Sequence, residues 1–342
     1  MSITAGHLPP LPDAPVDAAL APRVGQYEGA FDEVRWGYPK GWLKGQVQRA
    51  LTRKRWFQVL VSDGRLQLVA AIVDQGYGGY GWAWLVDGAT GDTLAHHGGL
   101  GAPLTTLVVG PKAGEGADAS MRLPWAQLRL RRGRGQSAFR LTGRWPGFDV
   151  DLHLDTAGTP PAVTAIGVSP EGGPGLTQRH GALRVDGVVE AKGLRHTFER
   201  GLASLEYTNA FFGHAVAWQS AVGLGVDLGG SPIAFALSDA PHVGGAADAA
   251  AWVSKSLRAA SAPTFELGAD PGRDRWTIRT AEGTELRFSP HGHRVDAVNV
   301  GVVKTRVVRA VGRFDGHVTS ADGIEAAVES VYGLCEARDL KW

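Results

Sequence analysis

The stretch FDVDLHLD, Phe148 to Asp155, decides the class of fold, because apolar and polar side chains alternate along its whole length. This period of two places one side of an extended strand against a core and the other side in water. Similar short segments recur along the chain: Trp56 to Val61, Leu66 to Val73, Leu128 to Arg131, Phe139 to Arg144, Trp276 to Arg279, Leu286 to Ser289, and Val302 to Val311. The sequence therefore predicts an all-β protein with few or short helices.

Turn-forming dipeptides separate these segments. Asp-Gly occurs at 63–64, 87–88, 186–187, 315–316 and 322–323, and it tolerates the positive φ angles of tight hairpins. Sequential hairpins at short spacing favour sandwiches or up-and-down barrels. With a Gly/Pro-rich linker near the middle of the chain, we predict an extended arm at 1–22, a first antiparallel barrel at 23–160 and a second at 161–342.

The segment from Ala246 to Ala260 is ambiguous between helix and hairpin. Its alanine content and the spacing of Ala250, Val253 and Leu257 suit a helix. Trp252 and Val253 followed by Ser-Lys-Ser could equally form two short strands. The residues alone leave both alternatives open.

Composition excludes several classes of function. With 342 residues and 44% apolar content, the chain has room for two cores, and its formal net charge of +1 lacks the footprint of a nucleic-acid binder. No apolar run approaches the ~18 residues of a membrane span. The single cysteine, Cys335, excludes an internal disulfide framework. Because the first residues also lack a signal-peptide pattern, we expect a cytoplasmic protein.

Histidine pairs at 96–97 and 291–293 invite a metal interpretation. Adjacent residues on a strand point to opposite faces, and the second pair has no acidic or histidine partner at a recognisable spacing. Metal-binding, phosphate-binding and nucleophile-elbow motifs are missing from the sequence. We therefore expect neither a metal ion nor a cofactor.

Aromatic residues cluster in one predicted strand. Tyr80, Trp82 and Trp84 share one face of this strand, and Tyr77 lies just before it in the chain. A row of large aromatic side chains either fills a barrel or lines a ligand cavity, since both need a wide apolar surface.

The strongest candidate for chemistry surrounds Glu206. Together with Tyr207, His214 and Trp218, this carboxyl group lies in a largely apolar run. Apolar surroundings raise the pKa of a carboxyl group, which can then act as a general acid near neutral pH, with His214 as its partner. The alternative is a structural role, in which Glu206 and His214 bond each other or the backbone in a packed wall.

Further polar candidates follow apolar strands. Asp74 comes directly before the aromatic row and is either a second partner base or a turn residue. Asp239 and His242 follow an apolar strand in the second half. Strand ends are where pocket residues gather in such folds, so both are candidates for ligand binding.

The chain resembles an uncharacterised bacterial family of domain-of-unknown-function type that is remotely similar to carotenoid 1,2-hydratase and AttH-like proteins of the calycin group. Five segments carry this resemblance: Gly37-Tyr38 to Gly41-Trp42, Lys54-Arg55-Trp56-Phe57, Val73-Asp74-Gln75-Gly76-Tyr77, Leu205-Glu206-Tyr207-Thr208, and the tail with Gly312-Arg313-Phe314-Asp315-Gly316 and Gly333-Leu334-Cys335-Glu336 to Trp342. Glu206 stands where an aspartate is usual.

The resemblance implies two tandem lipocalin-like barrels, a ligand cavity towards their junction, and a strand pair at Ala246 to Ala260. It also implies a lipid, isoprenoid or other apolar ligand. Our first hypothesis is a cofactor-free hydratase, cyclase or isomerase with Glu206 as proton donor. Rival hypotheses are a non-catalytic carrier with the same aromatic wall and a protein-interaction module. Ligand identity and oligomeric state are left open.

Overall fold

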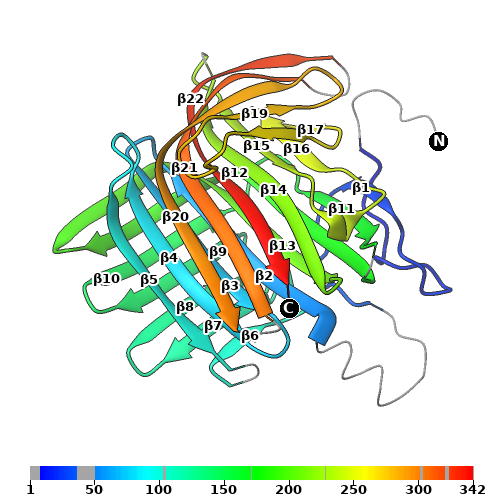
Figure 1. Ribbon diagram of the computed structural model, residues 1–342, viewed down its shortest axis with the longest axis horizontal. Helices are drawn as coiled ribbons and strands as arrows, with labels where there is room; N and C mark the ends of the chain where they lie inside the picture. Colours follow the sequence, from blue (N-terminus) through cyan, green and yellow to red (C-terminus); the bar gives the residue numbers. More distant parts are fainter. Residues whose placement is uncertain are drawn as a thin grey trace.

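The computed structural model describes residues 8–36, 51–102, 105–170, 172–227, 229–300, 303–319 and 323–341. These ranges fold as two antiparallel sheets with a short 3₁₀ helix, η1 (Pro241–Val243), and a helical backbone at Leu51 and Thr52 (Figure 1). The all-β prediction is confirmed. Within these ranges, no helix is long and apolar enough to cross a membrane.

The first sheet forms a nearly closed barrel. Its strands are β1 (Gly25–Glu28), β2 (Arg53–Ser62), β3 (Leu66–Asp74), β4 (Gly79–Asp87), β5 (Thr93–Gly101), β6 (Leu107–Val109), β7 (Asp118–Leu123), β8 (Ala126–Arg131), β9 (Ala138–Trp145), β10 (Phe148–Asp155), β11 (Val163–Val168), β12 (Pro174–Ala191) and β13 (Leu194–Phe211). The order is β5-β4-β3-β2-β13-β12-β10-β9-β8-β7-β6, and β11 links β1 to β12. Because β4 and β5 lie against β6 and β7, the two ends of the sheet meet.

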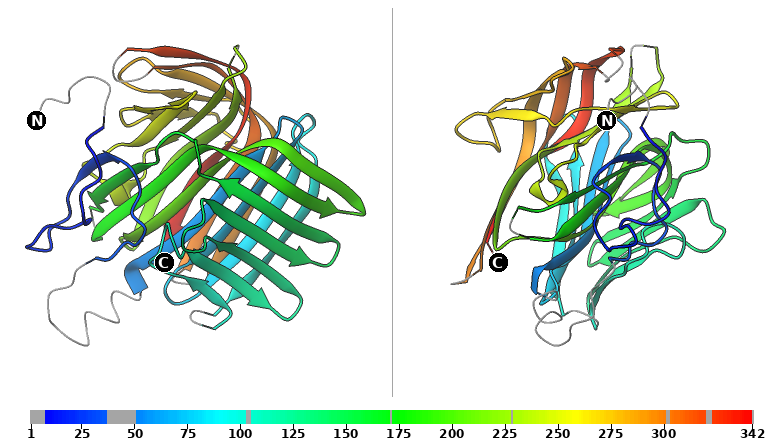
Figure 2. Two further views of the ribbon diagram at one scale, coloured as in Figure 1. Left: turned by 180° about the vertical axis from the view of Figure 1, so that it is seen from behind. Right: turned by 90° about the vertical axis from the view of Figure 1, so that its right-hand side faces the viewer.

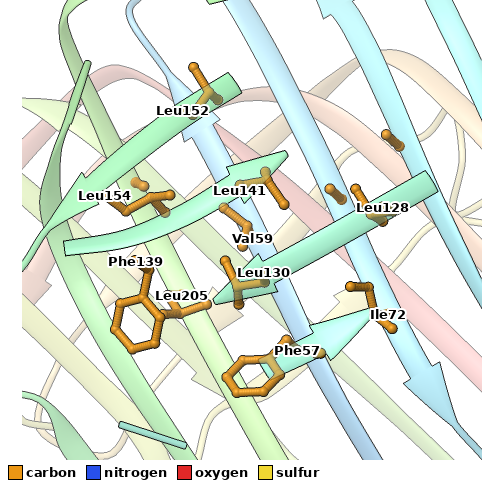
Figure 3. Packing of buried hydrophobic residues seen from close by; sticks show 14 of the residues in the cluster. Phe57, Val59, Ile72, Leu128, Leu130, Phe139, Leu141, Leu152, Leu154 and Leu205 are labelled. Atoms are coloured by element: carbon orange, nitrogen blue, oxygen red, sulfur yellow. The ribbon is translucent and has the colours of Figure 1, made fainter. Parts of the chain in front are cut away.

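Apolar side chains fill the interior of this barrel. The alternation in β10 places Val150, Leu152 and Leu154 inside and Asp149 and Asp151 outside, as the sequence predicts. Figure 3 shows Leu152 and Leu154 together with side chains from the opposite wall of the barrel. The labelled members are Phe57, Val59, Ile72, Leu128, Leu130, Phe139, Leu141, Leu152, Leu154 and Leu205. The barrel interior is therefore a packed core.

The second sheet forms a half-barrel. Its strands are β14 (Ala215–Val226), β15 (Pro232–Ser238), β16 (Asp248–Val253), β17 (Ser256–Ala259), β18 (Thr264–Leu267), β19 (Trp276–Arg279), β20 (Glu285–Val300), β21 (Val303–Thr319) and β22 (Glu325–Lys341). The order is β17-β16-β15-β14-β22-β21-β20-β19-β18. The ambiguous segment is the hairpin β16–β17, as the family resemblance implies.

The chain changes sheet at residues 212–214, between β13 and β14. The sequence placed the division at residue 160, where the Gly/Pro-rich stretch lies. That stretch is a connection within the first sheet, because the long strands β12 and β13 pair with β10 and β2 and complete the barrel. Turn composition alone does not distinguish a hairpin loop from a linker.

The half-barrel packs against the outer face of the first barrel. In the side view of Figure 2, the orange and red strands of the second sheet form one layer and the blue and cyan strands β2–β4 the next. A glycine allows one close approach, because a Cβ atom on Gly181 would lie 2.2 Å from the ring of Trp252. The two sheets are thus in close contact at this position.

Candidate functional site

Strand β2 separates the barrel core from the junction. Phe57 and Val59 point into the barrel, so the alternate residues Lys54, Trp56 and Gln58 point towards the second sheet. All five side chains are buried. Polar residues that would normally face water are therefore enclosed between two sheets.

A cavity with a volume of about 40 Å³ lies in this junction. Such a volume has room for a few water molecules. Its walls come from β2, β3, β4 and the β3–β4 turn on one side and from β14, β21 and β22 on the other. The lining residues are Lys54, Trp56, Gln58, Ala71, Val73, Gln75, Tyr80, Trp82, Trp218, Val307, Arg309, Arg338 and Leu340.

Aromatic rings form much of the wall. The ring centroids of Trp56 and Trp218 are 6.4 Å apart in a stacked arrangement, and Phe212 stacks on both rings. His242 packs edge-on against the same two tryptophans and is bonded to the Thr177 hydroxyl through Nε2 at 2.7 Å. Burial lowers the pKa of His242 to about 4, so its ring is neutral.

Two arginines face the cavity across a shared carboxylate. Glu336 accepts hydrogen bonds from Arg309 Nε at 2.8 Å and from Arg338 Nη2 at 2.5 Å. Gln58 donates to the same carboxylate at 2.8 Å. Burial opposes the charge of Glu336, but Arg338 and Arg309 outweigh it and lower the pKa of this carboxyl group. The anion holds both cations in place.

Lys54 brings an ionisable amine to the opposite side of the cavity. Its Nζ donates to the backbone oxygens of Leu51 at 2.5 Å and Gln75 at 2.7 Å, and it lies 4.4 Å from the centroid of the Tyr77 ring. Burial lowers the pKa of Lys54 to about 7, with Asp74 acting in the other direction. This amine can therefore lose or accept a proton near neutral pH.

Glu206 lies beside this site and is held by several donors. Its Oε1 accepts from Trp56 Nε1 at 2.6 Å and from the Thr208 hydroxyl at 3.2 Å, while Oε2 lies 2.5 Å from Arg179 Nη1. Arg179 also makes a two-pronged contact with buried Asp248. Glu206 is not one of the described residues that line the cavity. It fixes the orientation of the Trp56 ring.

The other two predicted catalytic residues lie elsewhere. His214 is exposed in the connection between the sheets, and no contact with Glu206 is found within the described ranges. Asp74 pairs with Arg55 at 2.8 Å and accepts from the backbone of Gly76. Strand alternation places Asp74 on the barrel side of β3, away from the cavity. The three predicted groups are not brought together.

Of the predicted ligand-binding residues, Tyr80, Trp82 and Trp218 line the cavity. Trp84 lies on the same face of β4 as Tyr80 and Trp82, but its side chain is fully buried and its indole Nε1 donates to the Thr93 hydroxyl at 3.0 Å. His242 lies behind the aromatic wall, as described above.

Three more of these residues lie off the cavity wall. Tyr77 is exposed and contacts the site through Lys54. Tyr207 packs on Phe57 inside the barrel. Asp239 is exposed and caps the backbone of Gln219.

Sequence reasoning missed Lys54, Gln58, Arg309 and Arg338 as site residues. A signal was present for Lys54 and Gln58, because both are polar residues at alternate positions of β2, a strand that is otherwise apolar from Trp56 to Val61. Such a polar face predicts contact with water unless a second sheet covers it. The resemblance segments 37–42 and Trp342 lie outside the described residues.

A second hollow of about 770 Å³ lies on the outer surface of the first barrel. Its walls carry ion pairs between partly exposed or exposed side chains, such as Arg140–Asp151 and Arg144–Asp149. Charged, solvated walls do not suit an apolar ligand. In the described part of the chain, no group of three or more His, Cys, Asp or Glu side chains could hold a metal ion.

The fold defines a class of all-β protein in which a barrel and a half-barrel enclose a small cavity at their junction. The chain belongs to the family described as Domain of unknown function (DUF2804), whose profile matches residues 23–342. The membership of an uncharacterised domain family expected from the sequence is thereby confirmed. No curated protein matches the chain.

Solved structures share this fold at low sequence identity. Kievitone hydratase from Nectria haematococca has 10% identity and a TM-score of 0.53, over 86% of this chain and 90% of that chain. CghA with Sch210972 has 12% identity and a TM-score of 0.51, over 98% of both chains. A putative AttH from Nitrosomonas europaea has 15% identity and a TM-score of 0.49, over 90% of this chain and 98% of that chain.

Proposed function

We propose that this protein is a cofactor-free enzyme that moves protons on an apolar small molecule bound at the sheet junction. The observation that carries the proposal is the composition of the cavity wall. Aromatic rings of Trp56, Trp82 and Trp218 stand beside the amine of Lys54 and the phenol of Tyr80. A carrier needs only apolar walls, whereas this cavity adds groups that can exchange protons.

Lys54 takes the role of acid and base in this proposal, in place of Glu206. As an ammonium group it protonates a C=C or C=O group of the ligand. The resulting neutral amine recovers a proton from an added water molecule in hydration, or from a neighbouring carbon in isomerisation and cyclisation. The proton count is then unchanged at the end of the cycle. Glu206 serves as a positioning residue for Trp56.

The likeness to kievitone hydratase supports this class of reaction, since hydration requires proton transfer without an electron acceptor. The shared fold does not transfer the substrate. Because the cavity holds only a few water molecules, a bicyclic ligand requires its lining side chains to move apart.

A small ketone tests the chemistry directly. The probe is 2-tetralone, a bicyclic ketone with acidic α-hydrogens, incubated in D₂O and followed by proton NMR. We expect the protein to accelerate deuterium uptake beyond the buffer rate, and Lys54→Met to lower this rate by roughly 10²-fold or more. Lys255→Met, at an exposed turn of the second sheet, is the control and should keep the wild-type rate.

One result would count against an enzyme, and another against Lys54 as its acid and base. Exchange no faster than in buffer, with 2-tetralone bound by NMR, would favour the carrier. If Lys54→Met kept the wild-type exchange rate, Lys54 would not be the acid and base, and Glu206 would be the next candidate.

A further inference from the structure

The charged groups on the cavity wall are all of one sign. Among the residues that the structure describes, the lining includes Lys54, Arg309 and Arg338 but no carboxylate. Each arginine lies over an indole that also lines the cavity: the Arg309 guanidinium carbon is 4.4 Å from the ring centroid of Trp82, and that of Arg338 is 5.0 Å from Trp218. Flat cationic and aromatic surfaces thus alternate around the same small space.

The arginines are anchored on one edge and available on the other. Arg338 uses Nη2 to reach Glu336 and Gln58, and Arg309 uses Nε and Nη1 to reach Glu336 and Asp296. Within the described ranges, no hydrogen-bond partner is found for Nε and Nη1 of Arg338 or for Nη2 of Arg309. These three nitrogens are accessible, because none of them is among the buried polar atoms that lack a partner. These N–H groups are therefore accessible donors on two arginines that line the cavity.

We infer that the ligand of the junction cavity is a flat apolar molecule that carries an acidic oxygen, as a carboxylate, phenolate or enolate, directed at Arg338 and Arg309. This inference rests on the proposed function and names its substrate class. Charge-assisted hydrogen bonds from a guanidinium fork to an anionic oxygen are stronger than those to neutral acceptors. A neutral ligand would cover the same N–H groups without matching their charge, at a desolvation cost.

Glu336 makes this recognition possible without competing for it. Its two oxygens accept hydrogen bonds from Arg309, Arg338 and Gln58, which holds both guanidinium groups in place, and Glu336 is not among the described residues that line the cavity. Both guanidinium groups and the indoles of Trp82 and Trp218 line the same cavity. A pre-arranged pair of donors of this kind loses little conformational entropy on binding.

The test compares two probes of the same shape, 2-naphthoate and the neutral 2-naphthamide. Their dissociation constants for the full-length protein are measured at pH 7 and low salt by quenching of tryptophan fluorescence. We expect naphthoate to bind at least about tenfold more tightly than naphthamide. Arg338→Gln should remove most of this preference and leave naphthamide binding within about twofold. Arg144→Gln, which alters an exposed arginine of the first barrel, is the matched control.

Each outcome decides the question. A preference for naphthoate that Arg338→Gln abolishes supports the inference. Equal affinity for both probes overturns it while leaving the apolar pocket of the proposed function intact. Binding of neither probe contradicts both. Should Arg338→Gln fail to fold, the ratio of the two affinities for the wild-type protein still decides, and Arg338→Lys repeats the comparison with the charge retained.

Discussion

The two faces of strand β2 meet very different environments. On one face Phe57, Val59 and Val61 interdigitate with the rest of the barrel core, and the ion pair of Arg55 with Asp74 is buried at one end of that face. On the other face Lys54 and Gln58 meet the arginines of the second sheet around a small cavity. The barrel interior is optimised for packing density, whereas the junction keeps space and buried charge. Functional groups are therefore expected where the two sheets meet, outside the barrel.

The largest expected effect comes from breaking the barrel side alone. Phe139→Ala removes a fully buried ring from the barrel core and should lower the free energy of unfolding by about 3–5 kcal/mol. Urea unfolding measures this loss. Because the ring lies inside the barrel, the folded variant should keep the wild-type affinity for 2-naphthoate. A parallel loss of affinity would show that the two faces are not independent.

Breaking the ion-pair network at the junction should lower the free energy of unfolding by nearly as much. Glu336→Gln leaves two buried arginines without their shared anion, and we expect a loss of about 3 kcal/mol in urea unfolding. Asp149→Asn, at an exposed ion pair, should change stability by less than about 1 kcal/mol. If the two variants were equally stable, the Glu336 network would contribute nothing to the junction.

A side chain added at Gly181 should force the two sheets apart where they approach closely. Gly181→Val would place atoms inside the ring of Trp252, so either the strand or the indole must shift. We expect a loss of about 1–3 kcal/mol in the same unfolding assay. Gly193→Val is unsuitable as a control because its φ is +77°. Gly78→Val, where nothing lies within 4 Å of an added Cβ, should be much milder.

Stability should also depend on pH through Lys54. Its pKa is 10.5 in the unfolded chain and about 7 in the folded protein, so between these values the unfolded state binds more protons. Raising the pH through this window therefore stabilises the fold. From pH 7 to pH 9 we expect wild-type stability to gain about 2 kcal/mol relative to Lys54→Met. If the difference in unfolding free energy between the wild-type protein and Lys54→Met were the same at both pH values, the lowered pKa of the buried amine would be contradicted.

Much of the fold could be predicted from the sequence, and less of the site. Alternation in Phe148 to Asp155 and the Asp-Gly turns predicted the strands, and the shared parity of Tyr80, Trp82 and Trp84 predicted their common face. The pairing of distant strands could not be predicted in this way, so the division was placed at 160 instead of 212–214. The same limit concealed the site, because Arg309 and Arg338 reach Trp82 and Gln58 only when the second sheet docks.

Glu206 illustrates how a local pattern can mislead. Its sequence neighbours are mostly apolar, and they suggested a carboxyl group in an apolar environment. Across the sheet its partner in register is Arg179, which lies on β12 and forms an ion pair with it. Local composition therefore described the wrong surroundings for this side chain.

We expect apolar ligands to bind between the sheets and not inside the barrel. The most direct measurement is a crystal structure of the protein soaked with 6-bromo-2-naphthoate, in which the anomalous signal of bromine locates the ligand. We expect a ring between Trp82 and Trp218 with its carboxylate on Arg338. Bromine inside the barrel, among Phe57, Phe139 and the leucines of Figure 3, would contradict it.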